Sequence, residues 1–290
     1  MPNQPFEASF MIDFNLHQVP AAVGLEVPAQ AGAAIVGSSE DQFIAYVSNL
    51  KRQVRADAQR LLENPNLAQA LEQLELSEGG TVMTIGDSIT TYRRGYAELL
   101  GAMLELQFSE HRLRFLNVGQ SGYTSTHGKE LVFTQLLRLE PDLVTIKFGS
   151  NDTKHFGGST QPMLVSLEEY RQNIDSMVQG FQAHTRARIV LIAPAPIVEQ
   201  VVNSSIDYQA MHMTWDNADL RALGVILHEI AEHRQVSFVD FYSSLGDPPD
   251  PRLFLADGLH PGPAGHELML NSLLLSLAQT QATSKQGKTS

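Results

Sequence analysis

Ser88, Asp257 and His260 are the residues whose types and spacing most directly suggest chemistry. Ser88 ends a Gly-Asp-Ser tripeptide, and Asp257 and His260 lie three residues apart in an Asp-Gly-Leu-His segment. A serine hydroxyl needs a neighbouring base to become a nucleophile. If Asp257 accepts the Nδ1 proton of His260, Nε2 is left as that base. Taken alone, each segment is also typical of an ordinary turn, and the chain has 10 histidines.

Two further polar turns provide hydrogen-bond donors for an oxyanion. Acyl transfer passes through a tetrahedral intermediate whose negative oxygen needs fixed donors. Gly119 offers a backbone N–H without a side chain in the way, Asn151 offers an amide NH2, and the N–H of Ser88 would be a third donor. Glycine and asparagine are common in turns, so each position taken singly is also explained by turn geometry.

The elements that would position these residues alternate regularly from Thr81 onward. Short apolar runs predict five strands, and the periodic stretches between them predict helices. The strands are expected at Thr81–Ile85, Leu113–Val118, Leu143–Phe148, Arg188–Ala193 and Val236–Phe241, and the helices near 93–107, 127–139, 166–183, 206–234 and 263–278. This order is typical of an α/β fold with a mostly parallel sheet between two layers of helices.

Sites in open parallel sheets form beyond the carboxyl ends of the strands. Polar, glycine-containing turns follow four of the predicted strands, and together they hold all five residues named above. We therefore expect these residues to converge at one edge of the sheet. A dinucleotide-binding domain would need a Gly-x-Gly-x-x-Gly turn after the first strand, and that turn is absent.

The four segments, in this order and spacing, resemble blocks I, II, III and V of the GDSL hydrolases, also called the SGNH family. The resemblance covers residues from 81 to the last predicted helix. It implies a flavodoxin-like three-layer α/β/α fold and a hydrolase among esterases, lysophospholipases, thioesterases and carbohydrate deacetylases. The implied roles are nucleophile for Ser88, base for His260, orienting carboxylate for Asp257, and oxyanion donors for Ser88, Gly119 and Asn151.

Residues 1–78 have no counterpart in the minimal domain of that family. Alternating apolar residues predict a strand at 10–16, residues 20–37 are expected to form a loop, and a capping box at Ser39 begins a predicted helix over 40–63. A second short helix is expected at 66–75. We interpret 1–78 as an arm that packs on the hydrolase domain, residues 79–279, or on a second copy of the chain, and 280–290 as a disordered tail.

Asp87, Asp152 and His155 lie beside the expected catalytic residues and are candidates for the substrate pocket. A plain loop explains His155 equally well, and a structural hydrogen bond is the simpler explanation for Asp87. Arg93 and Arg94 could meet an anionic group of a substrate, but a solvated helix face also explains them. The remaining histidines share no spacing with carboxylates that indicates a metal.

The composition disfavours several classes of function. A formal net charge of -12, from 20 basic and 32 acidic side chains, argues against nucleic acid as a partner. The chain has no cysteine, so disulfides and cysteine nucleophiles are excluded. No apolar run is long enough to span a membrane, and no signal pattern opens the chain, so we expect a cytoplasmic protein without membrane insertion.

The function expected from the sequence is hydrolysis of short-chain acyl or acetyl esters, a sugar ester among them, through an acyl-enzyme and without a cofactor. Lysophospholipids and thioesters are the alternative substrates. A different class also stays open, namely a non-catalytic binding or assembly protein on the same fold. The helix at 40–63 could bury its apolar stripe within the chain or in a homo-oligomer.

Overall fold

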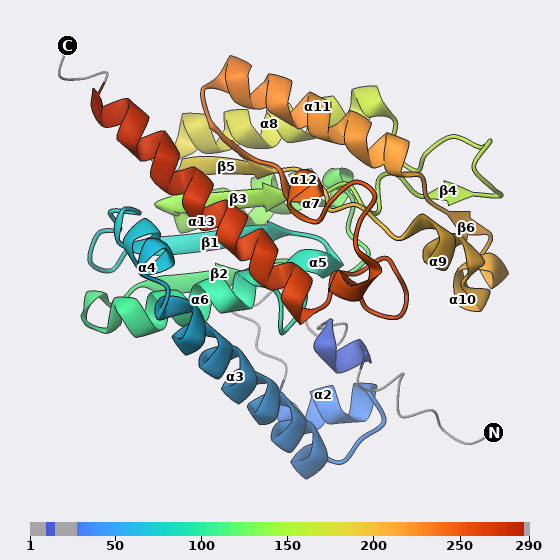
Figure 1. Cartoon of the computed structure of the whole chain (residues 1–290), viewed down its shortest axis with the longest axis horizontal. Coiled ribbons are helices and arrows are strands. Elements are labelled where there is room, and N and C mark those ends of the chain that lie inside the picture. The colour runs from blue at the N-terminus through green and yellow to red at the C-terminus, as the bar shows by residue number, and fades with distance from the viewer. Residues whose placement is uncertain (1–9, 15–27, 287–290) are drawn as a thin grey trace.

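The computed structural model describes residues 10–14 and 28–286, with residues 279–286 described by their backbone only. A five-stranded sheet lies at the centre, and all its neighbouring strands are parallel (Figure 1). Across the sheet the strands are β2 (Arg114–Asn117), β1 (Thr81–Gly86), β3 (Leu143–Lys147), β5 (Arg188–Ile192) and β7 (Ser237–Val239). Numbered along the chain, these five strands have the order 2-1-3-4-5, which is the flavodoxin-like order.

Helices cover both faces of the sheet, so the predicted three-layer α/β/α fold is confirmed (Figure 1). One layer contains α3 (Glu40–Leu62), α4 (Pro65–Glu72), α6 (Tyr96–Gln107) and α13 (Pro263–Gln286). The other contains α7 (Ser125–Leu131), α8 (Leu167–His184) and α11 (Asn217–Arg234). Shorter helices lie in the connections or pack on α3, and they are α2 (Ala29–Ile35), α5 (Ser88–Thr91), α9 (Glu199–Ser204), α10 (Ile206–Ala210) and α12 (Phe241–Ser244).

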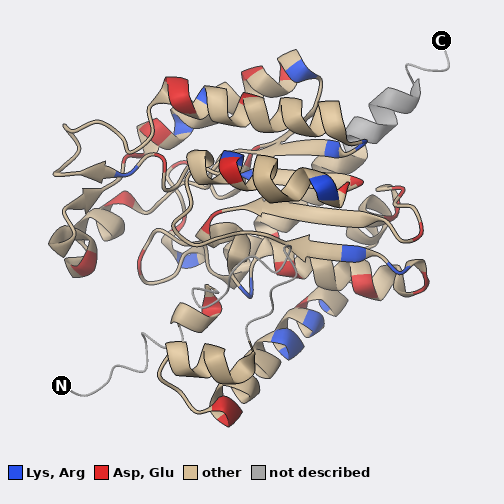
Figure 2. Ribbon diagram, turned by 180° about the vertical axis from the view of Figure 1, so that it is seen from behind, with Lys and Arg blue, Asp and Glu red and all other residues tan. Residues whose placement is uncertain are grey.

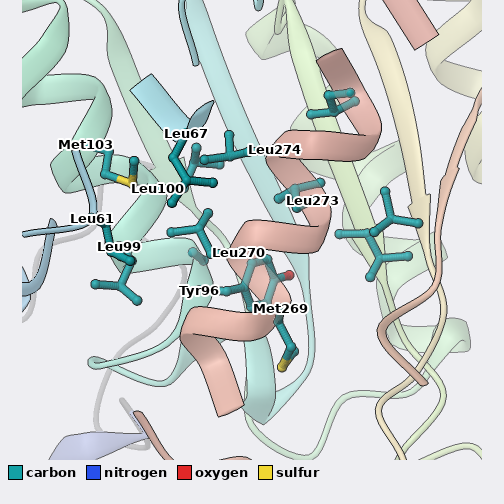
Figure 3. Packing of buried hydrophobic residues seen from close by; sticks show 14 of the residues in the cluster. Leu61, Leu67, Tyr96, Leu99, Leu100, Met103, Met269, Leu270, Leu273 and Leu274 are labelled. Carbon is teal, nitrogen blue, oxygen red and sulfur yellow. The ribbon is translucent and has the colours of Figure 1, made fainter. Parts of the chain in front are cut away.

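The core lies on both faces of the sheet because successive strand residues point to opposite sides. On β1, Val82 packs in the cluster beneath α6 and α13, whereas Met83 and Ile85 pack in the cluster beneath α8 and α11. Figure 3 shows the first cluster, in which leucines of α13 interdigitate with side chains of α6. Strands that are buried on both faces appear as continuous apolar runs, which is why their positions could be predicted.

The strand predictions are confirmed, each within two residues of its predicted bounds. Two predicted helices are interrupted. The window 127–139 contains α7, a π-helical turn at Val132–Leu136 and a 3-10 turn at Leu137–Leu139. The window 206–234 contains α10, then β6 (Met213–Thr214), then α11. The chain breaks there because β6 pairs with the equally short β4 (His155–Phe156), and the Asp216 carboxylate then caps α11 by accepting the Ala218 N–H at 2.6 Å.

The N-terminal part differs most from the expectation. The predicted strand at 10–16 is wrong over the described residues, because 10–13 form a helical turn; residues 15 and 16 lie outside the description. Backbone carbonyls in this segment accept from side chains of Arg93 and Ser121 rather than from a neighbouring strand. The predicted loop at 20–37 contains α2, and its residues 20–27 are outside the description. Helix α13 continues to Gln286, so the expected disordered tail is helical as far as that residue.

Helix α3 and its capping box at Ser39 are confirmed, and the short helix expected at 66–75 is α4, which ends three residues earlier. Buried side chains of both helices, such as Leu61 and Leu67, belong to the same cluster as Leu100 of α6 and Leu273 of α13 (Figure 3). Helices α3 and α4 therefore share a core with the rest of the described chain. That residues 1–78 form a separate arm, with a boundary at residue 78, stays a prediction.

Charged residues are spread over the outer helices and the loops, as the rear view in Figure 2 shows. Helix α3 carries several of the basic ones, including Lys51, Arg55 and Arg60. In the described part of the chain, no helix combines the length and the apolar character that crossing a bilayer requires.

Candidate active site

Ser88 lies where β1 ends and the one-turn helix α5 begins. The Asp87 carboxylate caps this helix by accepting the Ile89 N–H at 3.0 Å. Gly86 makes the turn possible, since a Cβ there would lie 2.5 Å from the Lys147 carbonyl oxygen and still closer to Thr90. The Ser88 side chain is thereby held at the carboxyl edge of the sheet, as the sequence predicted.

The imidazole of His260 meets Ser88, although the two residues are separated by 172 positions. The Ser88 hydroxyl lies 2.8 Å from His260 Nε2, and His260 Nδ1 lies 2.6 Å from Asp257 Oδ2. A carboxylate can only accept, so Nδ1 carries a proton, and in the neutral imidazole Nε2 then accepts from the serine hydroxyl. Both the serine and the histidine are at least nine-tenths buried. The three residues therefore form one continuous hydrogen-bonded chain.

A tight turn brings Asp257 and His260 together. Gly258 between them has a φ of +69°, which favours glycine, and a Cβ there would approach Val201 to 2.7 Å. Asp257 Oδ1 accepts the backbone N–H groups of Leu259 and His260, each at 3.0 Å. Burial raises the pKa of the Asp257 carboxyl, but the hydrogen bonds and charge of His260 outweigh it, so the pKa is lowered overall. The carboxylate is therefore an anion that can stabilise an imidazolium.

The three expected oxyanion donors follow the ends of the adjacent strands β2, β1 and β3. Register brings the ends of β1 and β3 level, with Gly86 opposite Lys147, so the turns that hold Ser88 and Asn151 are neighbours. One Asn151 amide N–H donates to the Tyr123 carbonyl at 3.0 Å, which leaves the second N–H for another acceptor. The Ser88 N–H is the first in α5 and has no acceptor within that helix.

Gly119 differs from the expectation in one respect. Its N–H already donates to the Asn117 side-chain carbonyl at 3.1 Å. The need for glycine here comes from packing as well, because a Cβ would lie 2.7 Å from the Thr91 backbone nitrogen. The turn that follows β2 therefore fits tightly against α5. The Asn117 amide at the end of β2 fixes this turn further by donating to the Thr90 carbonyl at 2.9 Å.

Asp87 supports the serine turn from inside the protein. Its carboxylate is fully buried and pairs with Lys147 Nζ, at 3.0 Å for Oδ1 and 2.9 Å for Oδ2. The same ammonium donates to Ser150 Oγ at 3.1 Å, so it ties the serine turn to the turn of Asn151. Burial lowers the Lys147 pKa, and the charge of Asp87 partly offsets this. Sequence reasoning missed Lys147; its signal is a lysine inside an otherwise apolar strand.

Asp152 and His155 are also buried and held by protein partners. Asp152 accepts the Ser125 N–H at 2.9 Å and the Ser125 hydroxyl at 2.5 Å. Burial raises the pKa of its carboxyl to about 6, although the Ser125 hydrogen bonds lower it. His155 places Nδ1 2.5 Å from the Gln161 carbonyl and Nε2 2.8 Å from Asp219. Asp87, Asp152 and His155 therefore all have hydrogen-bond partners within the protein, and their expected role in the substrate pocket stays a prediction.

The two arginines that follow α5 contact residues that precede β1 in the sequence. Arg93 donates from its side chain to the Ile12 carbonyl at 2.9 Å and from its backbone N–H to the Asp13 carbonyl at 2.8 Å. Arg94 pairs with Asp57 of α3 at 3.3 Å. Among the described residues, no group of three or more histidine and carboxylate side chains is arranged to hold a metal ion.

Comparison with known proteins defines the class. Isoamyl acetate-hydrolyzing esterase 1 homolog of Homo sapiens is 27% identical over 202 residues, which cover 66% of this chain and 79% of that protein. Acetylxylan esterase of Geobacillus stearothermophilus is 24% identical over 220 residues, covering 69% of this chain and 95% of that protein. The protein is a carboxylic ester hydrolase.

A family model identifies the family. The model of the GDSL-like lipase/acylhydrolase family matches residues 84–268, and the chain belongs to that family. The crystal structure of the Geobacillus stearothermophilus acetylxylan esterase has a TM-score of 0.56 at 23% identity, over 70% of this chain and 96% of that chain. An α/β hydrolase from the metagenome of Lake Arreo has the same TM-score at 24% identity and the same coverage. Both share the fold.

Proposed function

We propose that the protein hydrolyses short-chain carboxylic esters, acetates above all, through a covalent acyl-enzyme on Ser88. The observation that carries the proposal is the continuous chain of hydrogen bonds from the Ser88 hydroxyl through His260 to Asp257. A nucleophile beside a base, with the base oriented by a third group, is the arrangement that activates a serine.

The first half of the reaction acylates the serine. Ser88 Oγ attacks the ester carbonyl carbon while His260 Nε2 takes the hydroxyl proton, and the Asp257 carboxylate stabilises the imidazolium. The tetrahedral intermediate collapses as the bond from carbon to the alcohol oxygen breaks, and Nε2 returns its proton to that oxygen. The alcohol leaves, and the acyl group remains on Oγ.

The second half releases the acid. Water gives a proton to Nε2 as its oxygen attacks the acyl carbon, and the imidazolium then protonates Oγ as that bond breaks. In both halves the carbonyl oxygen carries negative charge, for which we propose the Ser88 N–H and the second Asn151 N–H as donors. Gly119 is the third, and it would share its N–H between the substrate and Asn117.

The preference for acetate is supported by the names of the relatives. Both the isoamyl acetate-hydrolyzing esterase homolog and the acetylxylan esterase are named for acetyl esters, although their alcohols are unlike. Lysophospholipids and thioesters are the alternative substrates. A panel of p-nitrophenyl esters from acetyl to decanoyl, beside acetylated xylosides and an acetyl thioester, distinguishes them. A maximum at long chains would contradict the acetate proposal.

Labelling with a fluorophosphonate probe tests the nucleophile directly, because the probe reacts only with an activated hydroxyl. We expect wild-type protein to be labelled and Ser88→Ala not to be. Hydrolysis of p-nitrophenyl acetate should fall by about 10⁴- to 10⁶-fold in Ser88→Ala and in His260→Ala. Ser176→Ala, which removes an exposed hydroxyl on α8, is the matched control and should keep both signals. An unlabelled wild type with native circular dichroism would favour the non-catalytic binding protein.

A further inference from the structure

Two phenylalanines from the N-terminal segment, residues 10–14, lie beside the ring of His260. The ring of Phe14 is 4.5 Å from the His260 ring between centroids, and it also stacks on Tyr92 at 4.9 Å. The Phe10 ring is 4.6 Å from Phe14 and 6.1 Å from His260, edge-on to the imidazole. Phe14 is 1% exposed, whereas Phe10 is only partly buried. An aromatic wall therefore borders the imidazole, with Phe14 inside and Phe10 at its surface.

This segment is fixed in place from several directions. The carbonyls of Ile12 and Asp13 accept from Arg93, and the Phe14 carbonyl accepts from the Ser121 hydroxyl at 2.8 Å. On the other side, Tyr46 of α3 donates to the Asp13 carboxylate at 2.9 Å. The Ile12 side chain is buried in a small cluster with residues of α2 and α3. Residues 10–14 are therefore a fixed part of the surface around the histidine.

The position of the wall determines which part of an ester it meets. His260 Nε2 must come within hydrogen-bonding distance of the departing alcohol oxygen to protonate it. The alcohol therefore leaves past the imidazole, and side chains that border the imidazole lie beside the alcohol. The acyl group, in contrast, is held on Ser88 and directed by the oxyanion donors.

We propose that residues 10–14 form the subsite for the alcohol part of the ester, with Phe10 as the ring that contacts it and Phe14 as a positioning residue for His260. This inference rests on the proposed esterase function and adds a substrate class to it. The subsite favours acetates of alcohols with an apolar chain or face, because Phe10 gives up water-exposed apolar surface when such an alcohol binds. The family match begins at residue 84, so this wall lies outside the matched region.

The common acetyl-enzyme makes the proposal sharply testable. Acetates of different alcohols share one acyl-enzyme and therefore one deacylation step. The alcohol contributes only to acylation, which kcat/KM reports. A side chain that contacts the alcohol should change kcat/KM for some acetates and leave the deacylation rate alone.

The experiment compares hexyl acetate with ethyl acetate in wild type, Phe10→Ala and Phe10→Leu. We expect Phe10→Ala to lower kcat/KM for hexyl acetate by about tenfold, a loss equivalent to about 1.4 kcal/mol of apolar contact. Ethyl acetate should change by less than about twofold on the same scale. Phe10→Leu should recover most of the loss. Phe133→Ala, which removes a half-exposed phenylalanine packed beside Gly180 of α8, is the matched control.

Phe14→Leu tests the positioning role separately. It should lower kcat/KM for both acetates by a similar factor and slow deacylation, while the melting temperature shows that the chain still folds. Equal losses for both esters in Phe10→Ala, or no loss in either, would overturn the alcohol subsite. Failure of the proposed esterase function has a separate readout, because a wild type without that function would not be labelled at Ser88 by a fluorophosphonate.

Discussion

The buried side chain of Lys147 links the turn that holds Ser88 with the turn that holds Asn151. Lys147 and Asp87 are both fully buried, and the ammonium also contacts Ser150. Removing one partner of such a pair leaves an uncompensated charge in the protein interior. The lysine thus stabilises the fold at the point where two strands must end side by side.

Replacing Lys147 by methionine should therefore be costly. We expect the free energy of unfolding to fall by about 3–5 kcal/mol, because the Asp87 carboxylate loses its counter-ion without gaining water. Urea unfolding followed by circular dichroism measures the change. The double variant Lys147→Met with Asp87→Asn should regain part of the loss, since a neutral amide needs no counter-ion. A loss below about 1 kcal/mol in the single variant would contradict this account of the pair.

At the scale of elements, a carboxylate connects β3 with α7. Asp152 follows β3 and accepts both the backbone N–H and the hydroxyl of Ser125, the first residue of α7. Burial raises its pKa to about 6 from an ordinary 3.8. The native state therefore binds this proton more tightly than the unfolded chain does. Between about pH 4 and 6 the native state holds more protons, so the stability due to this group falls as the pH rises.

Asp152→Asn should remove that part of the pH dependence. The asparagine oxygen can still accept from Ser125, but the group no longer ionises. We expect the wild type to lose about 2 kcal/mol relative to the variant between pH 4 and 7. Urea unfolding of both proteins at several pH values measures the difference. Parallel stability profiles for the two proteins would show that Asp152 does not titrate in this range.

The central sheet could be predicted because its strands are short apolar runs, and four of them are followed by a polar turn, as β3 is at Gly149. The helical turn in residues 10–14 could not be predicted. Its alternation at Phe10, Ile12 and Phe14 is typical of a strand, but a strand needs a partner, and here Arg93 and Ser121 take up the carbonyls. Such pairing is set by distant residues, which local periodicity does not contain. Ser88, Asp257 and His260 could be singled out in the sequence by their motifs, whereas the hydrogen bonds between them depend on the fold.

At the scale of the whole molecule, the N-terminal helices and the family domain share one interior. Leu61 of α3 is 6% exposed and belongs to the cluster that α6 and α13 form on the sheet. Ionic contacts add to this packing, since Arg60 of α3 lies 2.5 Å from Glu267 of α13. A shared core predicts that both parts unfold together.

Leu61→Ala should consequently destabilise the entire chain. A buried leucine truncated to alanine costs about 2–5 kcal/mol, and we expect one transition at a lower temperature in which helicity and esterase activity are lost together. Scanning calorimetry with parallel activity measurements tests this. Ile44→Ala, at a position of α3 that is 45% exposed, is the control and should change little. Two separate transitions would instead support an independent arm.

The long separation of Ser88 and His260 in the sequence has a consequence during protein synthesis. Ser88 is made early, and the histidine that would activate it is 172 positions later. When only the first three strands have left the ribosome, the Ser88 hydroxyl has no His260 beside it to act as a base. In the proposed mechanism, the Ser88 hydroxyl becomes nucleophilic only after the segment that carries His260 has been synthesised and has folded against it.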